Sequence, residues 1–341
     1  MSTQEYVQPS PLLGLAIGDA LGKPFESIEG YPTPPKPPPD WNLQYLPGRE
    51  EIVGEYGVPP GHFTDDTQMS LGLAKCLTAL GKWNRSEALL YYYAWRRGEG
   101  PYAPRGMGGT LRKALDYIAA RGMAQASDDL NESGVRHRAH PCAPLDPVND
   151  RYVECGTAMR AAPIGAFFSN EEEILKVATE DAYLTHSSIE AAAGSFAVAM
   201  AVRFQIQIET FGKYPASMLP SLRASLDRHF RNTRVAAAVD LVAALTHATP
   251  SAITLLRPDS DVASVVGSAL AFFALVEAKE YALTALRRAI HFGGDTDTRA
   301  AIVGALLGAR WGKDVFTYDL VQGVERSAEL MALDRLLVRR T

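Results

Sequence analysis

The sequence predicts an all-α fold, and three observations support this prediction. After residues 64–67, apolar residues recur at three- and four-residue steps, which places them on one face of a helix. Alternating β-branched runs between Asn-Gly or Asp-Gly turns, which would indicate strands, are absent from the sequence. Hydrophobic residues make up 47% of the 341 residues and charged residues 21%, so a sizeable core can form.

The expected helices cover most of the chain. The first apolar stripe comprises Met69, Leu73, Cys76, Leu77 and Leu80. Similar stripes cover residues 85–95, 110–120, 171–182, 188–204, 234–246, 262–277, 281–290 and 299–310. Glycines repeat every four residues at Gly14, Gly18 and Gly22, and again at Gly304 and Gly308. Because glycine lacks a side chain, we expect close helix packing here that brings acidic clusters together, with Asp19 as a supporting carboxylate.

Two segments interrupt the helical pattern. The prolines of residues 31–41 lack amide donors and predict an extended surface loop, in preference to a ligand for an SH3-type domain. Residues 205–220 are expected to form an irregular connection. No Gly/Ser-rich or highly charged linker divides the chain, so we expect one domain, 1–341, with loop insertions near 27–60 and 122–157.

A third segment, residues 124–154, is polar and leaves two interpretations open. It contains His137, His140 and Cys142, which could indicate zinc. Their spacing matches no standard zinc pattern, and a solvated loop near a site is the favoured interpretation. The three cysteines of the chain include no CxxC pair, so neither a disulfide framework nor a thiolate zinc site is expected.

The charge of the chain excludes several classes of partner. The formal net charge is −5 at pH 7, so no basic surface is expected to bind nucleic acid.

Residues 1–10 lack the basic and apolar pattern of a signal peptide, and the most apolar stretch, near 191–202, is too short to span a bilayer. We expect a cytoplasmic monomer without a membrane partner.

Two acidic clusters carry the clearest chemical signal. Residues 64–67 (TDDT) and 295–298 (DTDT) each precede an apolar-periodic helix, so both are expected at helix N-termini. N-capping is the structural alternative, because Thr and Asp oxygens accept the free amides of a first turn. One cap needs only one such residue, and adjacent carboxylates repel unless a cation or proton intervenes. The pair of clusters therefore favours a metal site.

The residue types in these clusters favour a particular kind of metal. They offer carboxylate and hydroxyl oxygens without thiolate or imidazole, which suits Mg²⁺ or Mn²⁺ better than zinc. A carboxylate such as Asp297 could bridge two ions about 3.5–4 Å apart, which can orient substrate oxygens and lower the pKa of a bound water. Spacing along the chain alone does not show that the clusters meet.

A glycine turn offers a second binding element. Gly106, Gly108 and Gly109 precede the helix expected from Thr110. Exposed amides and the helix dipole could cradle a diphosphate there without a lysine or arginine. The alternative is a flexible turn whose glycines only permit positive φ angles.

Five blocks of sequence stand out along the chain. They are GLAIGDALGKPFE at 14–26, GHFTDDTQMSLGLA at 61–74, RGMGGTLRKAL at 105–115, AMRAAPIG at 158–165 and HFGGDTDTRAAIVGALLGA at 291–309. In this order they resemble the signature motifs of the ADP-ribosylglycohydrolase family. The family includes enzymes that release ADP-ribose from modified arginine or serine and the hydrolase that reactivates dinitrogenase reductase. The resemblance implies a compact, orthogonal multi-helix bundle.

The resemblance also implies roles for individual residues. One metal ion is expected on Thr64, Asp65 and Asp66, and the other on Asp295, Asp297 and Thr298, with Asp297 shared. Glu26 resembles the family's mobile glutamate near the metals, and Glu26 and Asp66 are the candidates for proton transfer. Substrate binding is expected at Gly106, Gly108, Gly109, Thr110 and His186. The implied cofactors are two Mg²⁺ or Mn²⁺ ions.

Three hypotheses about function follow from these residues. The first is metal-dependent hydrolysis of the ribose C1 bond of an ADP-ribosylated protein or small molecule. The second changes the substrate to another small N- or O-glycoside, because Cys155 stands where the family usually has asparagine, and His291 where asparagine is typical. We expect these departures around the substrate pocket rather than among the metal ligands. The third is a non-catalytic ADP-ribose binder or structural protein, since the family resemblance includes crystallins.

Overall fold

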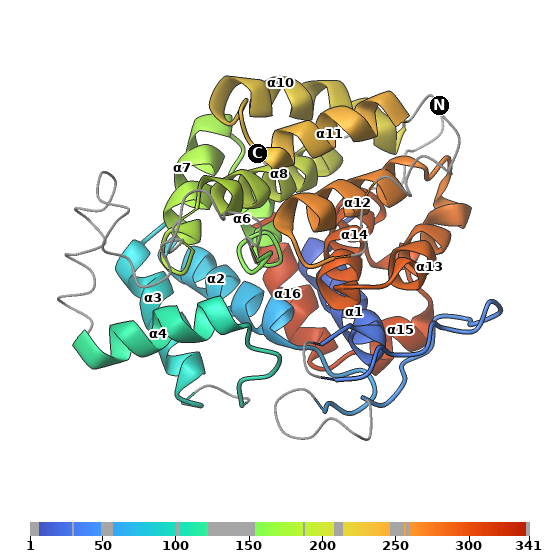
Figure 1. Cartoon of the computed structure of the whole chain (residues 1–341), viewed down its shortest axis with the longest axis horizontal. Helices are drawn as coiled ribbons and strands as arrows, with labels where there is room; N and C mark the ends of the chain where they lie inside the picture. The colour runs from blue at the N-terminus through green and yellow to red at the C-terminus, as the bar shows by residue number, and fades with distance from the viewer. Residues whose placement is uncertain are drawn as a thin grey trace.

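In the computed structural model, the regular elements among the described residues are all helices (Figure 1). The described residues are 7–28, 31–48, 57–99, 103–121, 154–186, 188–207, 214–245, 256 and 259–338. No strand occurs among them, and extended pairing is limited to an isolated bridge between Glu154 and Asp261. The all-α prediction is confirmed.

Two glycine-containing helices, α1 (Pro11–Gly22) and α14 (Thr296–Trp311), lie against each other inside the molecule (Figure 1). Every residue of α1 is buried. A Cβ atom added to Gly14 would lie 2.1 Å from the Gly304 carbonyl oxygen, and one added to Gly18 would lie 2.0 Å from the Ala300 oxygen. The predicted close packing is therefore confirmed. It brings the C-terminal end of α1 to the N-terminal end of α14.

We expect the replacement of Gly18 by Ala to lower the free energy of unfolding by at least about 2 kcal/mol, because rigid backbone atoms must move apart. Gly72→Ala is a matched control in α2 (Asp65–Leu80), since an added Cβ there would meet its nearest neighbour at 3.4 Å. The control should be neutral or slightly stabilising, because alanine favours the helix. Urea denaturation measures both variants, and equal stability of the two would contradict the prediction.

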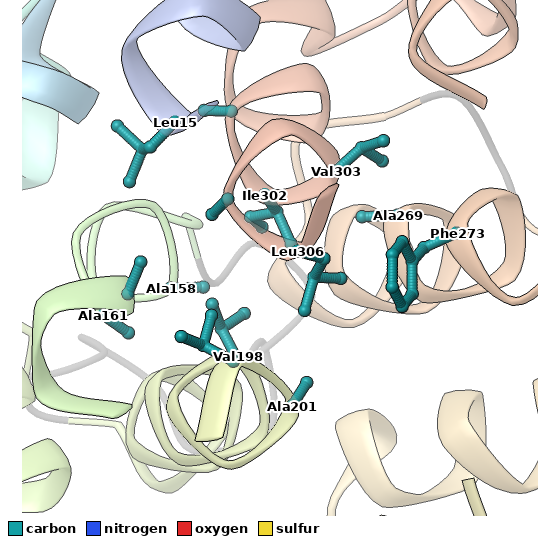
Figure 2. Close-up of a cluster of buried hydrophobic side chains, with 14 of the residues drawn as sticks. Leu15, Ala158, Ala161, Val198, Ala201, Ala269, Phe273, Ile302, Val303 and Leu306 are labelled. Atoms are coloured by element: carbon teal, nitrogen blue, oxygen red, sulfur yellow. The ribbon is translucent and has the colours of Figure 1, made fainter. Parts of the chain in front are cut away.

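The core lies where α14 meets α8 (Ile189–Ile206) and α12 (Val262–Ala274). Figure 2 shows Leu15 of α1, Val198 of α8 and Phe273 of α12 around Ile302 and Leu306 of α14. All five side chains are buried. A central helix that is apolar on several sides explains why α14 holds its first turn, at Asp295–Thr298, in a fixed place.

The remaining helices surround this core. One group in Figure 1 comprises α2, α3 (Arg85–Arg96) and α4 (Gly109–Arg121), whereas α7 (Glu171–Ala182) lies beside α8. The others are α6 (Ala162–Phe167), α10 (Leu219–His229), α11 (Arg234–Leu245), α13 (Ala282–Phe292), α15 (Tyr318–Gly323) and α16 (Ser327–Leu337). Short 3-10 turns are η1 (Lys23–Phe25), η3 (Pro215–Met218), η5 (Lys279–Tyr281) and η6 (Lys313–Val315).

The ends of two predicted segments differ from the structure. Helix α12 ends at Ala274 rather than at residue 277, although Val276 is still buried, because the apolar pattern continues into the loop. Within 205–220, the start belongs to α8 and the end to η3 and α10, so an irregular connection was the wrong prediction for those parts. Pro215 and Pro220 lie in the first turns of η3 and α10, where a missing amide costs no hydrogen bond.

The proline-rich residues 31–41 form neither helix nor strand, as predicted. Three of them, Pro34, Pro37 and Trp41, are nevertheless buried. The Trp41 ring lies edge-on to that of Phe25, with the ring centroids 5.2 Å apart. This contact fixes one end of the segment to the body of the protein, which disfavours a free ligand for another domain.

Helix α8 is relevant to the membrane prediction. It spans 18 residues with a mean hydropathy of 1.3, so it is longer than the apolar stretch noted in the sequence and sufficient in length and composition to cross a bilayer. Within the fold, 89% of it is buried, as is usual for a core helix. The zinc alternative at His137, His140 and Cys142 lies outside the described residues.

Candidate active site

The first turns of α2 and α14 line one cavity of about 290 Å³. Both acidic clusters are at helix N-termini, as predicted. The predicted site residues that line the cavity are Glu26, Asp65, Asp66, Gly106, Gly108, Gly109, His186, Asp295, Asp297 and Thr298. Thr64 and Thr110 are the two that do not line it. Packing of α1 against α14 thus gathers residues from distant parts of the sequence.

The fully buried carboxylate of Asp19 positions the Thr64–Thr67 turn. The backbone amide of Thr64 donates to Asp19 at 3.0 Å, and the Thr64 hydroxyl donates to it at 2.8 Å. The Thr67 amide and hydroxyl donate to the same carboxylate at 3.1 and 2.7 Å. Thr64 therefore forms no side-chain cap on its own helix. The supporting role expected of Asp19 accounts for both threonines.

The Asp295 turn combines capping with a carboxylate cluster. Asp295 accepts the Thr298 amide at 3.2 Å, so the capping interpretation is correct for this residue. Asp297 accepts the same amide at 3.1 Å. Burial would raise the pKa of Asp297, but the Lys23 ammonium and a hydrogen bond with Asp295 hold it below its usual value. Asp297 is thus held as an anion at the centre of the site.

Carboxylate oxygens form two groups that could each hold a cation, and both groups contain Asp297. The first group is Asp19, Asp66 and Asp297, and the second is Glu26, Asp295 and Asp297. Within each group, one oxygen per residue lies within 4.8 Å of the others. Asp65 lines the cavity but belongs to neither group among the described residues.

A divalent cation fits the chemistry of these groups. The Oδ1 atom of Asp66 is buried and accepts no hydrogen bond from the residues that the structure describes. Burial, together with neighbouring carboxylates, raises the pKa of Asp66 well above its usual range and that of Asp295 to about 7. A bound cation would lower both, because it stabilises the charged form. An all-oxygen donor set of this kind suits Mg²⁺ or Mn²⁺.

Lys23 and Glu26 lie beside the second group. The Lys23 ammonium contacts Glu26 Oε2 and lies 3.2 Å from Asp297 Oδ2. Burial and the Asp297 carboxylate raise the pKa of Glu26 to about 8, against the opposing effect of Lys23. The Glu26 side chain is 21% exposed and lines the cavity, so it is accessible from there. Sequence reasoning assigned no role to Lys23.

The departure at Cys155 reaches the predicted metal ligands. Its thiol donates to Asp295 Oδ2 at 2.8 Å, and its sulfur lies 3.5 Å from the Thr298 hydroxyl oxygen. Burial and the Asp295 carboxylate raise the pKa of the Cys155 thiol well above its usual value. Cys155 also lines the cavity. Cys155 therefore lies at the cavity, as expected for this departure, and it also contacts two of the predicted metal ligands.

The glycine turn before α4 approaches the acidic cluster closely. Gly106 has a φ of +70°, and a Cβ there would lie 2.7 Å from Asp65 Oδ1, so only glycine fits. The backbone amide of Thr110, in the first turn of α4, donates to the Glu154 carboxylate at 3.2 Å. The Thr110 amide, which was predicted to bind a diphosphate, is thus already hydrogen-bonded to a carboxylate of the chain itself.

Arg160 supports the wall of the cavity from behind. This side chain is completely buried and pairs with Asp181 at 2.8 Å. It also donates to the Gly156 carbonyl at 2.8 Å and to the Thr185 hydroxyl at 2.9 Å. That hydroxyl lies 2.8 Å from Nδ1 of His186, which lines the cavity. Arg160 was within the AMRAAPIG block, but its partners could not be recognised from spacing.

Comparison with known proteins identifies the family. Residues 11–341 match the family model described as ADP-ribosylglycohydrolase. The chain belongs to this family. Its glycohydrolase character and its helical fold follow from membership, and the motif resemblance seen in the sequence is confirmed.

Three proteins to which this chain is similar share about a quarter of its residues over the aligned regions. A protein of Acanthamoeba polyphaga mimivirus, named as a candidate ADP-ribosyl glycohydrolase, is 25% identical over 87% of this chain and 84% of its own. ADP-ribosyl-[dinitrogen reductase] glycohydrolase of Rhodospirillum rubrum is 26% identical over 36% of this chain and 38% of its own. A solved structure, an ADP-ribosylglycohydrolase-related protein complex, shares the fold with a TM-score of 0.66 at 23% identity, covering 97% and 96% of the two chains.

Proposed function

We propose that this glycohydrolase cleaves the ribose C1 bond of ADP-ribosylated substrates, either protein side chains or related small molecules, with the help of two Mg²⁺ or Mn²⁺ ions. The observation that carries the proposal is the pair of oxygen-donor groups that share Asp297 and open on one cavity. The proposal includes a cytoplasmic monomer that requires neither nucleic acid nor membrane.

The ions would be held by Asp66 and Asp297 on one side and by Asp295 and Asp297 on the other, with Glu26 beside the second group and with Thr64, Asp65 and Thr298 as the further predicted ligands. When bound, such ions orient ribose hydroxyls and stabilise developing negative charge. Asp19 would keep the Thr64–Thr67 turn in place through its four hydrogen bonds.

Proton transfer is assigned to carboxylates of the chain. Glu26 is exposed to the cavity and would accept a proton from the attacking water, while positive charge develops at ribose C1. Asp66 is the second candidate, because its Oδ1 atom has no competing hydrogen bond. His186 would contact the substrate from the wall that Arg160 supports.

A second candidate function is hydrolysis of a smaller N- or O-glycoside that lacks a diphosphate. Glu154 favours it, since its carboxylate accepts the Thr110 amide at the start of α4. A diphosphate bound to Gly106, Gly108, Gly109 and Thr110 would have to displace this carboxylate. A panel of ADP-ribosyl-arginine, ADP-ribosyl-serine and simple ribosides distinguishes the two substrates.

The experiment that tests the proposal measures ADP-ribose release from a mixture of ADP-ribosylated proteins in Mg²⁺, Mn²⁺ or chelator. We expect release that needs the metal and disappears in Asp65→Ala, which removes a carboxylate of the cavity. Asp314→Ala is the matched control, because Asp314 is on the surface. Tight ADP-ribose binding without release in any metal would instead indicate a non-catalytic binder.

A further inference from the structure

Lys23 is a buried cation inside the acidic cluster. Its side chain is 2% exposed and follows α1 in the 3-10 turn η1. The ammonium contacts Glu26 and lies 3.2 Å from Asp297, so it touches two of the three carboxylates in the second donor group. A Cβ added to Gly106 would lie 3.4 Å from the same nitrogen. The lysine is therefore enclosed on the cavity side as well.

We infer that the Lys23 ammonium competes with the second divalent ion for the Glu26 and Asp297 carboxylates, so that the two ions bind in order and with unequal affinity. This inference rests on the two-metal part of the proposed function. It assigns Lys23 a role in setting metal occupancy rather than a step in catalysis.

The Lys23 ammonium contacts the two donor groups unequally, which is the condition for ions that bind in order. In the first group, the ammonium contacts one member, the shared Asp297, and Asp66 Oδ1 is buried with no hydrogen-bond donor among the described residues, so this oxygen is open to an ion. In the second group, the ammonium already satisfies Glu26 and Asp297. An incoming ion must displace it, because two cations on the same oxygens repel each other in a buried site.

The arrangement also explains how the metal-free protein tolerates so many buried carboxylates. Glu26, Asp65 and Asp297 all interact electrostatically with Lys23. A buried charge needs a partner of opposite sign, and the ammonium supplies one when no ion is bound. Replacement of Lys23 should thus weaken the metal-free fold while it strengthens binding of the second ion.

The experiment titrates the full-length protein with Mn²⁺ and follows binding by calorimetry and by EPR, which distinguishes isolated from coupled Mn²⁺ ions. For the unchanged protein we expect two steps whose dissociation constants differ by more than about tenfold, with isolated ions at one equivalent. In Lys23→Met, the second step should tighten by more than about tenfold. Lys23→Arg, which keeps the charge, should retain unequal steps.

Control variants separate this effect from damage to the fold. Lys313→Met changes an exposed lysine and should leave both steps as they were. If Lys23→Met does not fold without metal, Lys23→Gln replaces it, since the amide can still donate to Glu26. Melting temperatures in chelator and in Mn²⁺ give a second readout, and the gain on adding Mn²⁺ should be larger without the lysine charge.

Three results would overturn the inference. They are two equal steps in the unchanged protein, an unchanged second step in both uncharged variants, and a tightened second step in Lys23→Arg. Each leaves the proposed hydrolase intact, because ADP-ribose release is measured separately. Absence of any Mn²⁺ binding would overturn the two-metal proposal together with the inference.

Discussion

Glu26→Gln is expected to fold normally and to lower turnover by roughly 10²–10⁴-fold, the range typical for loss of a general acid or base. Glutamine has the same shape and can still accept a hydrogen bond from Lys23, but it cannot take a proton from water. The backbone around it should be unaffected, because the neighbouring Ser27 amide is fixed to the Gly294 carbonyl at 2.9 Å.

Single-turnover release of ADP-ribose measures this loss, and the melting temperature together with ADP-ribose affinity shows that the site persists. Glu99→Gln is the matched control, since Glu99 is on the surface with 52% of its side chain exposed. Full activity in Glu26→Gln would remove this carboxylate from proton transfer. The proposal would then depend on Asp66, whose replacement by Asn becomes the next test.

The sequence predicts the helices and acidic turns well, because both signals are local. Apolar periodicity marks a helix wherever one face is buried, and it identified the core helices α8, α12 and α14. Capping-type residues marked the starts of α2 and α14. No apolar stripe was assigned to α10, whose first residues fall in the segment 205–220 that was expected to be irregular, although Pro220 is tolerated in a first turn.

That the two acidic turns lie close together could be seen only in the structure. The glycine pattern of α1 and α14 indicated close packing, but not which partner each helix packs against. Thr64 illustrates the limit, because its sequence pattern fits a cap or a metal ligand, whereas its hydroxyl donates to Asp19. That bond joins residues 45 positions apart, and a sequence pattern does not predict which residues pair over such a separation.

Charged residues outside the acidic motifs were the hardest residues to predict. Lys23, Glu154 and Arg160 each appear in sequence as ordinary surface residues, because charged side chains are usually exposed. Their burial or contacts become clear only when the partners are known, namely Asp297, the Thr110 amide and Asp181. Two of the three lie within blocks that resemble the family, so the motif located them without explaining them.

Arg160→Met is expected to lower the free energy of unfolding by about 3–5 kcal/mol, the range for breaking a buried ion pair. The completely buried Asp181 carboxylate would lose its cationic partner and keep the Tyr92 hydroxyl, which donates to it at 2.7 Å. Methionine fills much of the volume, so the loss reports the unpaired charge more than a cavity. Urea denaturation measures it.

The matched control is Arg223→Met, which breaks an ion pair with Asp240 whose side chains are 54% and 43% exposed. Such surface pairs contribute about 0–1 kcal/mol, so this variant should remain near the unchanged protein. Arg160→Met within 1 kcal/mol of that control would contradict the prediction.

Arg160→Met combined with Asp181→Asn should recover part of the loss, because the double variant has no buried anion left unpaired. Recovery of stability without recovery of ADP-ribose binding would show that Arg160 also positions the Gly156 and Thr185 wall of the cavity, since the double variant still lacks those two hydrogen bonds.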